Sequence, residues 1–200
     1  MEKTELTTDA ELIRRYQQGD GKAFHVLVTR YQRQLASYLR RMVDDASAAD
    51  DLFQETFYKV IKSLPRYQEQ GTFSGWLFGI ANRLAIDYLR KHKRQTKIMK
   101  PVSQDNSGML SPDILDPHAP SPEEDVKQRE LKKYLKKAIK RLPAEQRQVL
   151  LLREHSGLSF KEIAAMLDCP LNTVLGRMRY ALLNLRKMAT NDFGELDNVL

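Results

Sequence analysis

The acidic residues between Asp44 and Glu55 come closest, in type and spacing, to a catalytic site. They form the only acidic cluster in the chain that could hold Mg²⁺, which prefers carboxylate oxygens. If they did bind Mg²⁺, the protein would be a metal-dependent nucleic-acid enzyme. The cluster spans a turn and a helix start, where acids favour the helix dipole in any case. No constellation of Lys, His or Arg accompanies it, so we expect no enzyme, no catalytic residue and no metal. The cluster consists of Asp44, Asp45, Asp50, Asp51 and Glu55.

No zinc site or disulfide is predicted. The only cysteine, Cys169, cannot form an internal disulfide, and we interpret it as a small buried apolar residue. The histidines have no zinc-ligand neighbours at useful spacing. They are His25, His92, His118 and His155.

The stretch from Leu158 to Lys187 carries residues suited to DNA binding. Ser159, with Glu162 three residues later, predicts a capping box at the start of a short helix. Pro170 ends that helix region, because proline cannot continue a helix interior. A second helix follows over Leu171 to Lys187, with basic residues and no acidic one. The pattern predicts a helix-turn-helix whose second helix enters the major groove, although an ordinary helical hairpin with a solvated basic face remains the alternative.

A rotation of 100° per residue divides this second helix into two sides. The apolar side comprises Leu171, Val174, Met178, Ala181, Leu182 and Leu185. The outward side comprises Asn172, Gly176, Arg179, Tyr180 and Leu183.

Four helices are predicted before these elements. Thr8 or Asp9 caps the first, and a long second helix starts at Asp20 with apolar residues at the i, i+3, i+4, i+7 spacing. Pro65 stops the third helix, and Ser74 caps the fourth. The third helix is expected to bury Leu52, Phe53, Phe57, Val60, Ile61 and Leu64. No strand alternation is present, so we expect an all-α fold.

The composition changes sharply after the fourth helix. Residues 83–100 hold seven Lys and Arg against one acid, whereas residues 101–126 hold six acids, no Lys or Arg, and five prolines. The acidic segment cannot bury enough apolar surface to order itself, so we predict a flexible linker. The predicted organisation is a helical domain at 1–96, a linker at 97–126, a helix-turn-helix domain at 127–190 and a tail at 191–200. Leu131, Leu135, Ile139 and Leu142 are expected to form the apolar face that opens the second domain.

The overall charge favours an anionic partner such as nucleic acid. The chain of 200 residues has a formal net charge of +7 and a pI of about 9.4. The N-terminal residues are polar, so no signal peptide is expected, and no apolar run approaches the length of a membrane span. We therefore expect a soluble, cytoplasmic protein that does not insert into membranes.

Taken together, four segments resemble the extracytoplasmic-function (ECF) group of sigma-70-type RNA polymerase sigma factors. The resemblance covers nearly all of the chain outside the linker and the tail. The segments are Gly19 to Phe24 with Arg30-Tyr31; Asp50 to Phe57; Phe73 to Ala81 with Asp87 to Arg90; and Leu142-Pro143 with Leu152 to Glu154 and Leu158 to Arg186. The resemblance implies two small helical domains, sigma-2-like and sigma-4-like. It implies a dissociable subunit that gives RNA polymerase its promoter choice and uses no cofactor.

The resemblance also implies particular contact residues in the first domain. The family's first domain binds the beta-prime clamp helices of core RNA polymerase, and the matching positions here are Asp51, Gln54, Glu55 and Lys59. It also melts the −10 element and captures bases from the separated strand. The corresponding residues here are Arg66, Tyr67, Phe73, Trp76, Asn82, Arg83, Arg90 and Lys91. The chain departs from the family at Gly79, where a basic residue is usual, and at Arg83, where asparagine is usual.

The second domain is expected to read the −35 element. Base-facing positions of the family match Leu175, Gly176, Arg179 and Tyr180, although the family usually has Lys or Arg at 175 and Ser at 176. The promoter sequence is therefore expected to differ from the usual one. Further candidates for this DNA surface, including phosphate contacts, are Arg153, Ser159, Lys161, Asn172, Thr173 and Arg177.

Two other interpretations remain beside the sigma factor. The metal-dependent enzyme depends on the acidic cluster alone. A stand-alone helix-turn-helix regulator would explain the second domain, but it would leave the first without a function. Family members are often held inactive by an anti-sigma factor, which is therefore an expected partner.

Overall fold

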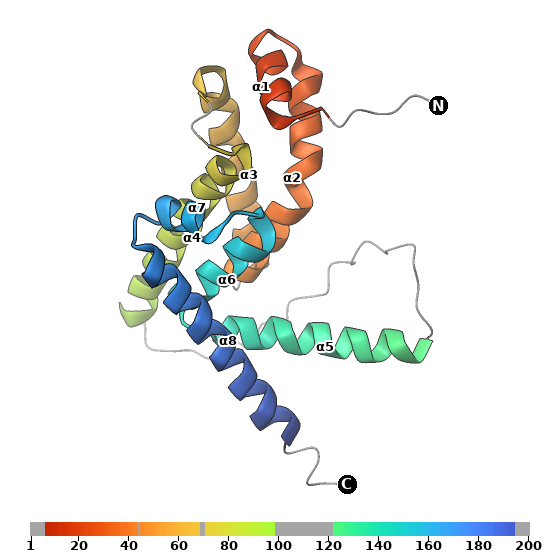
Figure 1. Cartoon of the computed structure of the whole chain (residues 1–200), viewed down its shortest axis with the longest axis vertical. Helices are drawn as coiled ribbons and strands as arrows, with labels where there is room; N and C mark the ends of the chain where they lie inside the picture. Colours follow the sequence, from red (N-terminus) through yellow and green to blue (C-terminus); the bar gives the residue numbers. More distant parts are fainter. Residues whose placement is uncertain (1–6, 44, 69–70, 99–121, 195–200) are drawn as a thin grey trace.

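The computed structural model describes residues 7–43, 45–68, 71–98 and 122–194. Within these ranges the chain is helical and contains no strand, as predicted (Figure 1). Its elements are α1 (Asp9–Gln17), α2 (Gly21–Met42), α3 (Ala46–Ser63), η1 (Leu64–Arg66), α4 (Phe73–Ile98), α5 (Pro122–Arg141), α6 (Ala144–Ser156), α7 (Phe160–Met166) and α8 (Leu171–Gly194).

Side-chain caps begin three helices of the first domain, which consists of α1 to α4. The side chain of Thr8 accepts a hydrogen bond from the N–H of Glu11, and Asp20 accepts one from Lys22. Asp45 does the same for the N–H of Ala48 at the start of α3. Each cap satisfies a backbone donor that has no partner inside the helix, which is worth about 1 kcal/mol.

The core of the first domain lies where α2, α3 and α4 meet. Tyr38, Leu39 and Met42 of α2 and Leu77 and Phe78 of α4 are fully buried there. The Tyr38 and Phe78 rings meet edge to face at 5.5 Å between their centroids. α1 packs on α2, where Asp9 binds the side chains of Arg30 and Tyr31. Those contacts fix the first turn of α1.

The second domain consists of α5 to α8. α6 ends at Gly157, whose φ of +71° suits glycine, and α7 begins with the predicted capping box between Ser159 and Glu162. Asp168, with φ of +49°, lies in the turn to α8. Val174 and Ala181 of α8 are fully buried, so the predicted helix-turn-helix is present.

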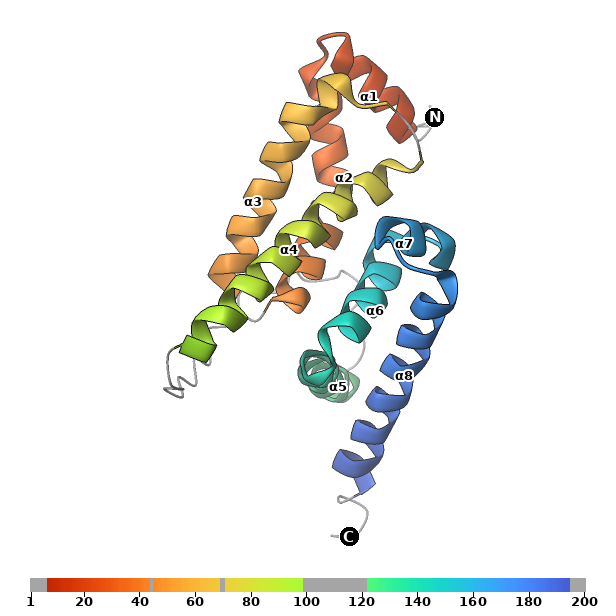
Figure 2. The ribbon, with the colours of Figure 1, turned by 90° about the vertical axis from the view of Figure 1, so that its left-hand side faces the viewer.

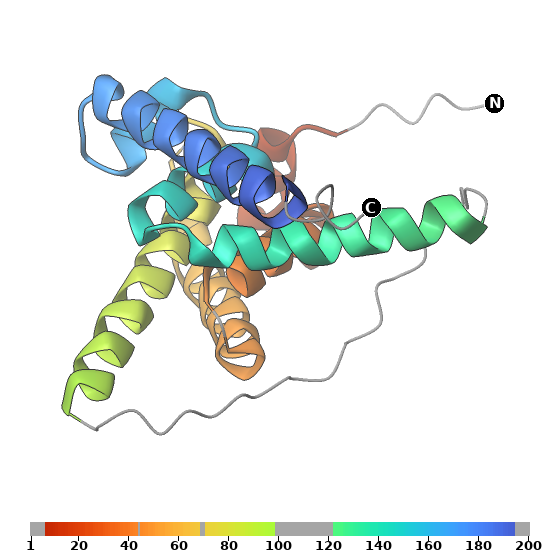
Figure 3. The ribbon, with the colours of Figure 1, turned by 90° about the horizontal axis from the view of Figure 1, so that it is seen from below.

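The two domains pack against each other in this structure. α6 lies against α2 and α4, and α7 lies against α4 (Figure 2). Their buried apolar residues form one continuous cluster. By contrast, the first half of α5 extends away from the body of the molecule (Figure 3).

Several predicted details of the helices were wrong. α4 begins at Phe73 and its N-terminal cap is Thr72, which accepts from the N–H of Gly75 at 3.2 Å, rather than Ser74. α5 begins at Pro122, so residues 122–126 are helical and not part of the linker. Four residues expected on apolar faces are exposed instead, because no described element covers that part of their helices: Ile61, Leu131, Leu135 and Leu182.

Among the described residues, no helix is long and apolar enough to span a membrane.

Candidate nucleic-acid and protein interfaces

One side of α3 forms an exposed polar strip. Asp51, Gln54, Glu55 and Lys59 are all exposed, while Leu52, Thr56 and Val60 on the opposite side are buried. The Lys59 ammonium lies 3.5 Å from the Glu55 carboxylate, and both side chains are about half exposed. Such an exposed pair stabilises the helix by only a few tenths of a kcal/mol, so a binding partner could break the pair at little cost to the helix.

Two exposed apolar residues extend this strip, and sequence analysis missed both as surface residues. Tyr58 is 57% exposed and Ile61 is 43% exposed. Tyr58 follows Glu55 by three residues and Asp51 by seven, so it lies on the same side of α3. The Lys62 ammonium lies 4.5 Å from the Tyr58 ring centroid. A large apolar residue amid charged ones is typical of the centre of a protein interface.

Three described members of the acidic cluster have other partners within the chain. Asp45 caps α3, and Asp50 pairs with Arg40 at 3.1 Å. Glu55 pairs with Lys59. No group of three potential metal ligands is found among the residues that the structure describes, which exclude Asp44.

Three aromatic residues hold the chain between η1 and α4. The rings of Tyr67 and Trp76 lie 4.5 Å apart, and Phe73 lies 6.2 Å from Tyr67 and 5.8 Å from Trp76. Phe73 is only 2% exposed, so its predicted DNA contact does not occur in this arrangement and its ring is part of the core. Tyr67 and Trp76 are partly exposed.

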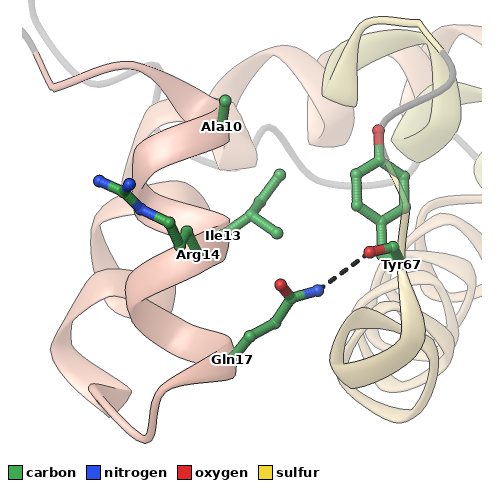
Figure 4. Close-up of a pocket in the computed structure, with 5 residues that line it drawn as sticks. All are labelled: Ala10, Ile13, Arg14, Gln17 and Tyr67. Atoms are coloured by element: carbon green, nitrogen blue, oxygen red, sulfur yellow. Dashed lines mark hydrogen bonds between the residues drawn. The ribbon is translucent and has the colours of Figure 1, made fainter.

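A small cavity lies between α1 and Tyr67 (Figure 4). Its volume is about 140 Å³, and its lining consists of Ala10, Ile13, Arg14, Gln17 and Tyr67. The amide nitrogen of Gln17 donates to the backbone oxygens of Leu64 at 3.1 Å and Tyr67 at 2.9 Å. The Gln17 oxygen faces Ile13 instead (Figure 4). Gln17 thereby fixes the loop to α1. Sequence analysis missed the α1 residues because no local pattern indicates which loop a helix touches.

The predicted −10 residues on α4 differ in exposure: some are exposed and one is buried. Arg83, Arg90 and Lys91 are exposed, as is Arg66 before the loop. Asn82 is only 6% exposed, and its side-chain oxygen accepts hydrogen bonds from the Tyr38 hydroxyl and from Gln148 of α6. In this arrangement Asn82 therefore makes a contact between the domains and does not face solvent.

The outward side of α8 is open. Asn172, Thr173, Leu175, Arg179 and Tyr180 are exposed, and Gly176 and Arg177 are half-buried. Leu175 is 41% exposed and Tyr180 is 61% exposed. The structure thus brings the predicted base-facing positions to one accessible side of a helix, opposite the buried Val174 and Ala181.

The residues flanking α7 also stabilise the turns there. Arg153 donates to the backbone oxygen of Leu158, and its guanidinium carbon lies 5.2 Å from the Phe160 ring centroid. The N–H of Ser159 donates to the Glu162 carboxylate at 2.8 Å, and hydrogen bonds with Ser159 lower the Glu162 pKa. Lys161 is exposed. Of these predicted phosphate-binding residues, Lys161 is the one whose charged group makes no contact within the described part of the chain.

Comparison with known proteins gives matches along most of the chain. Residues 27–95 match the family model Sigma-70 region 2, and residues 132–185 match Sigma-70, region 4. The chain is 35% identical over 179 residues to the ECF RNA polymerase sigma-E factor of Escherichia coli strain K12, covering 88% of this chain and 91% of that protein. It is 34% identical over 175 residues to the protein of the same name from Haemophilus influenzae, covering 87% and 91%.

Two solved structures share the fold. CnrH in complex with the cytosolic domain of CnrY matches with a TM-score of 0.66 and 22% identity, over 93% of this chain and 99% of that chain. The sigma factor RpoE in complex with the anti-sigma factor NepR from Bartonella quintana matches with a TM-score of 0.64 and 23% identity, over 84% and 98%.

Proposed function

The chain belongs to the ECF group of the sigma-70 family, and we propose that three exposed surfaces bind its partners. One surface binds the polymerase, one binds the −10 element and one binds the −35 element. The protein is a sigma factor: it binds core RNA polymerase and directs promoter-specific initiation. The observation that carries this conclusion is the presence of both sigma domains in one chain. A stand-alone helix-turn-helix regulator would have no use for the first domain.

The first surface is the exposed strip of α3, which binds the beta-prime clamp helices of the polymerase. Asp51, Gln54, Glu55 and Lys59 provide charge and hydrogen bonds, and Tyr58 adds apolar area at their centre. Complementary charges favour fast and correctly oriented association. All five side chains are exposed while the two domains are packed together, which supports this assignment.

The second surface captures the melted −10 strand. Tyr67 and Trp76 offer aromatic faces, and Arg66, Arg83 and Lys91 offer charge to the phosphates. The cavity beside Tyr67 would receive one unstacked base, with Ile13 beneath the ring and the Gln17 oxygen accepting from the base edge. Its volume of about 140 Å³ suits a single ring, since a cavity of about 150 Å³ holds benzene.

The third surface is the outward side of α8, which reads the −35 element. Arg179 and Tyr180 are the candidates for base edges, and Leu175 for a thymine methyl group. Lys161 and Arg177 would contact phosphates. We further expect an anti-sigma factor as a partner, of the kind that NepR is for RpoE. The protein would act in the cytoplasm, where the polymerase works.

Transcription in vitro tests the proposal directly. Core RNA polymerase is incubated with a genomic library, with and without the chain. We expect a set of new transcripts whose start sites share two upstream sequence elements. An unchanged transcript set would contradict the function.

A further inference from the structure

The outward side of α8 has a gap at its centre, where Gly176 stands. A Cβ atom on Gly176 would meet nothing within 4 Å beyond its chain neighbours and the adjacent helix backbone, so the fold has room for a side chain there. The backbone does not require glycine either, because Gly176 is not among the glycines with a positive φ. Gly79 differs, since a Cβ atom on it would lie 3.6 Å from Met166.

Glycine weakens α8 at this position. Gly176 is in the helix interior, past the first turn of a helix that begins at Leu171. Glycine is among the least favourable residues there, because its backbone loses the most conformational freedom on folding. Alanine would therefore stabilise the helix without a clash. Neither packing nor backbone geometry accounts for the glycine, which leaves a role toward a binding partner.

Four side chains surround this gap. Asn172 and Thr173 precede Gly176 by four and three residues. Arg179 and Tyr180 follow it by three and four residues. Residues at these spacings are neighbours on a helix surface, and all four are exposed. The gap is therefore a notch in an accessible surface, with larger side chains before and after it along the helix.

The two sides of the notch differ in chemistry. At 100° per residue, Thr173 and Tyr180 lie on one side of Gly176, and Asn172 and Arg179 lie on the other. The first side offers a methyl group and an aromatic ring. The second side offers an amide and a guanidinium group. The notch thus has an apolar wall and a polar wall.

A thymine paired with adenine in the major groove matches both walls. The thymine C5-methyl group projects into the groove, and the N6 and N7 atoms of adenine lie beside it. An asparagine can bind those two adenine atoms, and apolar groups such as a threonine methyl pack on the thymine methyl. The N-terminal residues of a recognition helix contact the base edges. Asn172, Thr173 and Gly176 all lie in that part of α8.

A phosphate would fit the notch less well. Phosphates bind the free backbone N–H groups of the first turn of a helix. Gly176 lies beyond the first turn of α8, so its N–H is engaged within the helix. The absence of a side chain adds no charge and no donor. What it adds is space for an apolar group.

We infer that Gly176 forms a notch that receives the methyl group of one thymine in the −35 element. A side chain at this position would fill the notch and hold α8 away from the bases. The inference rests on the proposed function in that it assigns the outward side of α8 to the −35 element. It adds a specificity-determining residue to that surface and requires a thymine at one promoter position.

Deoxyuridine in place of thymidine tests the methyl group by itself, because uracil pairs as thymine does and lacks only that methyl. Core RNA polymerase carrying the full chain is bound to duplex fragments of a promoter that it transcribes, each with one −35 thymine replaced. We expect one replacement to weaken binding about fourfold, which is the effect of one methyl group that is no longer removed from water.

Gly176→Ala tests the notch. Gly21→Ala is its matched control, because Gly21 is the first residue of α2 and a Cβ atom there also meets nothing within 4 Å. A thermal melt should show that Gly176→Ala is at least as stable as the parent. Its binding to the unmodified promoter should nevertheless fall by about fourfold or more. It should also no longer distinguish thymine from uracil at the sensitive position. The control should bind as the parent does.

The inference fails if no −35 thymine responds to replacement by uracil, or if the preferred element contains no thymine. It also fails if Gly176→Ala binds as tightly as the parent. Equal weakening on the thymine and uracil fragments would overturn it too, since the notch would then not receive the methyl group. The uracil series uses the parent chain, so it decides the question even if a variant misfolds. Failure of the proposed function is distinct, because the parent would then direct no transcription from any promoter.

Discussion

Arg179 is the residue on which promoter reading is expected to depend most. Its side chain is exposed on the outward side of α8, and no described residue pairs with it. If its guanidinium binds a guanine edge, Arg179→Ala should cost about 1–3 kcal/mol at one promoter position and relax the preference there. Selection of active promoters from a randomised −35 region measures this effect.

Leu175→Arg is the companion variant in the same selection. Leu175 is exposed and cannot donate a hydrogen bond, so an arginine there should add a new base preference. A uniform loss of affinity for Arg179→Ala, with a salt dependence lower by about one unit, would indicate a phosphate contact instead. If neither variant changes the preferred sequence, α8 does not read the bases.

Gln17 is expected to act on melting in two ways, through the loop that it fixes and through the base edge that its oxygen would accept from. Gln17→Leu removes both donors to the Leu64 and Tyr67 oxygens, which should free the loop and slow formation of the open complex. Permanganate footprinting of the melted strand measures this rate. Gln18→Leu, an exposed neighbouring position, is the control. Equal rates for both variants and the parent would show that Gln17 has no role in melting.

At the residue scale, sequence predicted exposed charges better than it predicted aromatic and amide contacts. Asp51, Glu55, Arg83 and Arg179 are exposed as expected, because long charged side chains are rarely buried. Phe73 and Asn82 were assigned to DNA from their place in the family pattern, yet both are buried. Their partners, Tyr31 and Gln148, are distant in sequence and could not be inferred from local spacing.

Helix α3 as a whole is expected to determine binding to the polymerase. Asp51→Lys with Glu55→Lys should weaken binding to core enzyme and leave the fold intact, since exposed charges change stability little while a complementary interface gains repulsion. Titration of labelled polymerase measures the affinity, and a thermal melt measures the fold. Glu11→Lys with Glu145→Lys, also exposed, gives the same change of net charge elsewhere.

A double variant of α3 that binds core enzyme as tightly as the control would rule out this strip as the polymerase-binding surface. So would a variant that unfolds, because the residues would then be structural.

At the element scale, helix starts were predictable and helix extents were not. Ser159 caps its helix as predicted, and Thr8 is the one of the two predicted candidates that caps α1, because a cap is a local signal in sequence. Asp20, predicted as the start of the second helix, is the N-cap of α2. The beginning of α5 was missed, since an acidic, proline-rich composition indicated a linker where Pro122 begins the helix. Proline is favoured in the first turn of a helix, so this composition fits the structure after all.

The contact between the domains should weaken as the pH falls. His155 of α6 is nearly buried, and its Nε2 atom has no hydrogen-bond partner. Burial lowers its pKa; nearby Arg41 lowers it further, and Glu154 opposes the shift. The separated or unfolded chain therefore takes up a proton near pH 6.5, while the packed chain does not. Stability should fall as the pH decreases below that value.

Urea unfolding of the parent and of His155→Gln between pH 5 and about 8 measures this effect. The variant should lose part of the dependence on pH, because glutamine does not titrate. Identical dependence in the two proteins would show that His155 is not responsible.

At the scale of the whole molecule, sequence predicted two helical domains but not their packing. The contacts of Asn82 with Gln148 and of Arg41 with Glu154 join residues far apart in the chain. Gly79 was noted only as a departure from the family. The structure gives it a neighbour, Met166, which no helical periodicity could have indicated.

The exposed strip of α3 and the packing of α6 and α7 on α4 lead to a prediction about the order of events in holoenzyme assembly. The strip is exposed while the two domains are packed together, so we expect docking on the polymerase to need no prior rearrangement. Stopped-flow mixing should then show a fast phase whose rate rises with polymerase concentration and a slower phase that does not. Gln148→Glu, which places a charge at the buried contact with Asn82, should accelerate the slow phase, and charge reversal on α3 should slow the fast one. The time from encounter with the polymerase to transcription would thus be set by how often the two domains of the chain separate from each other.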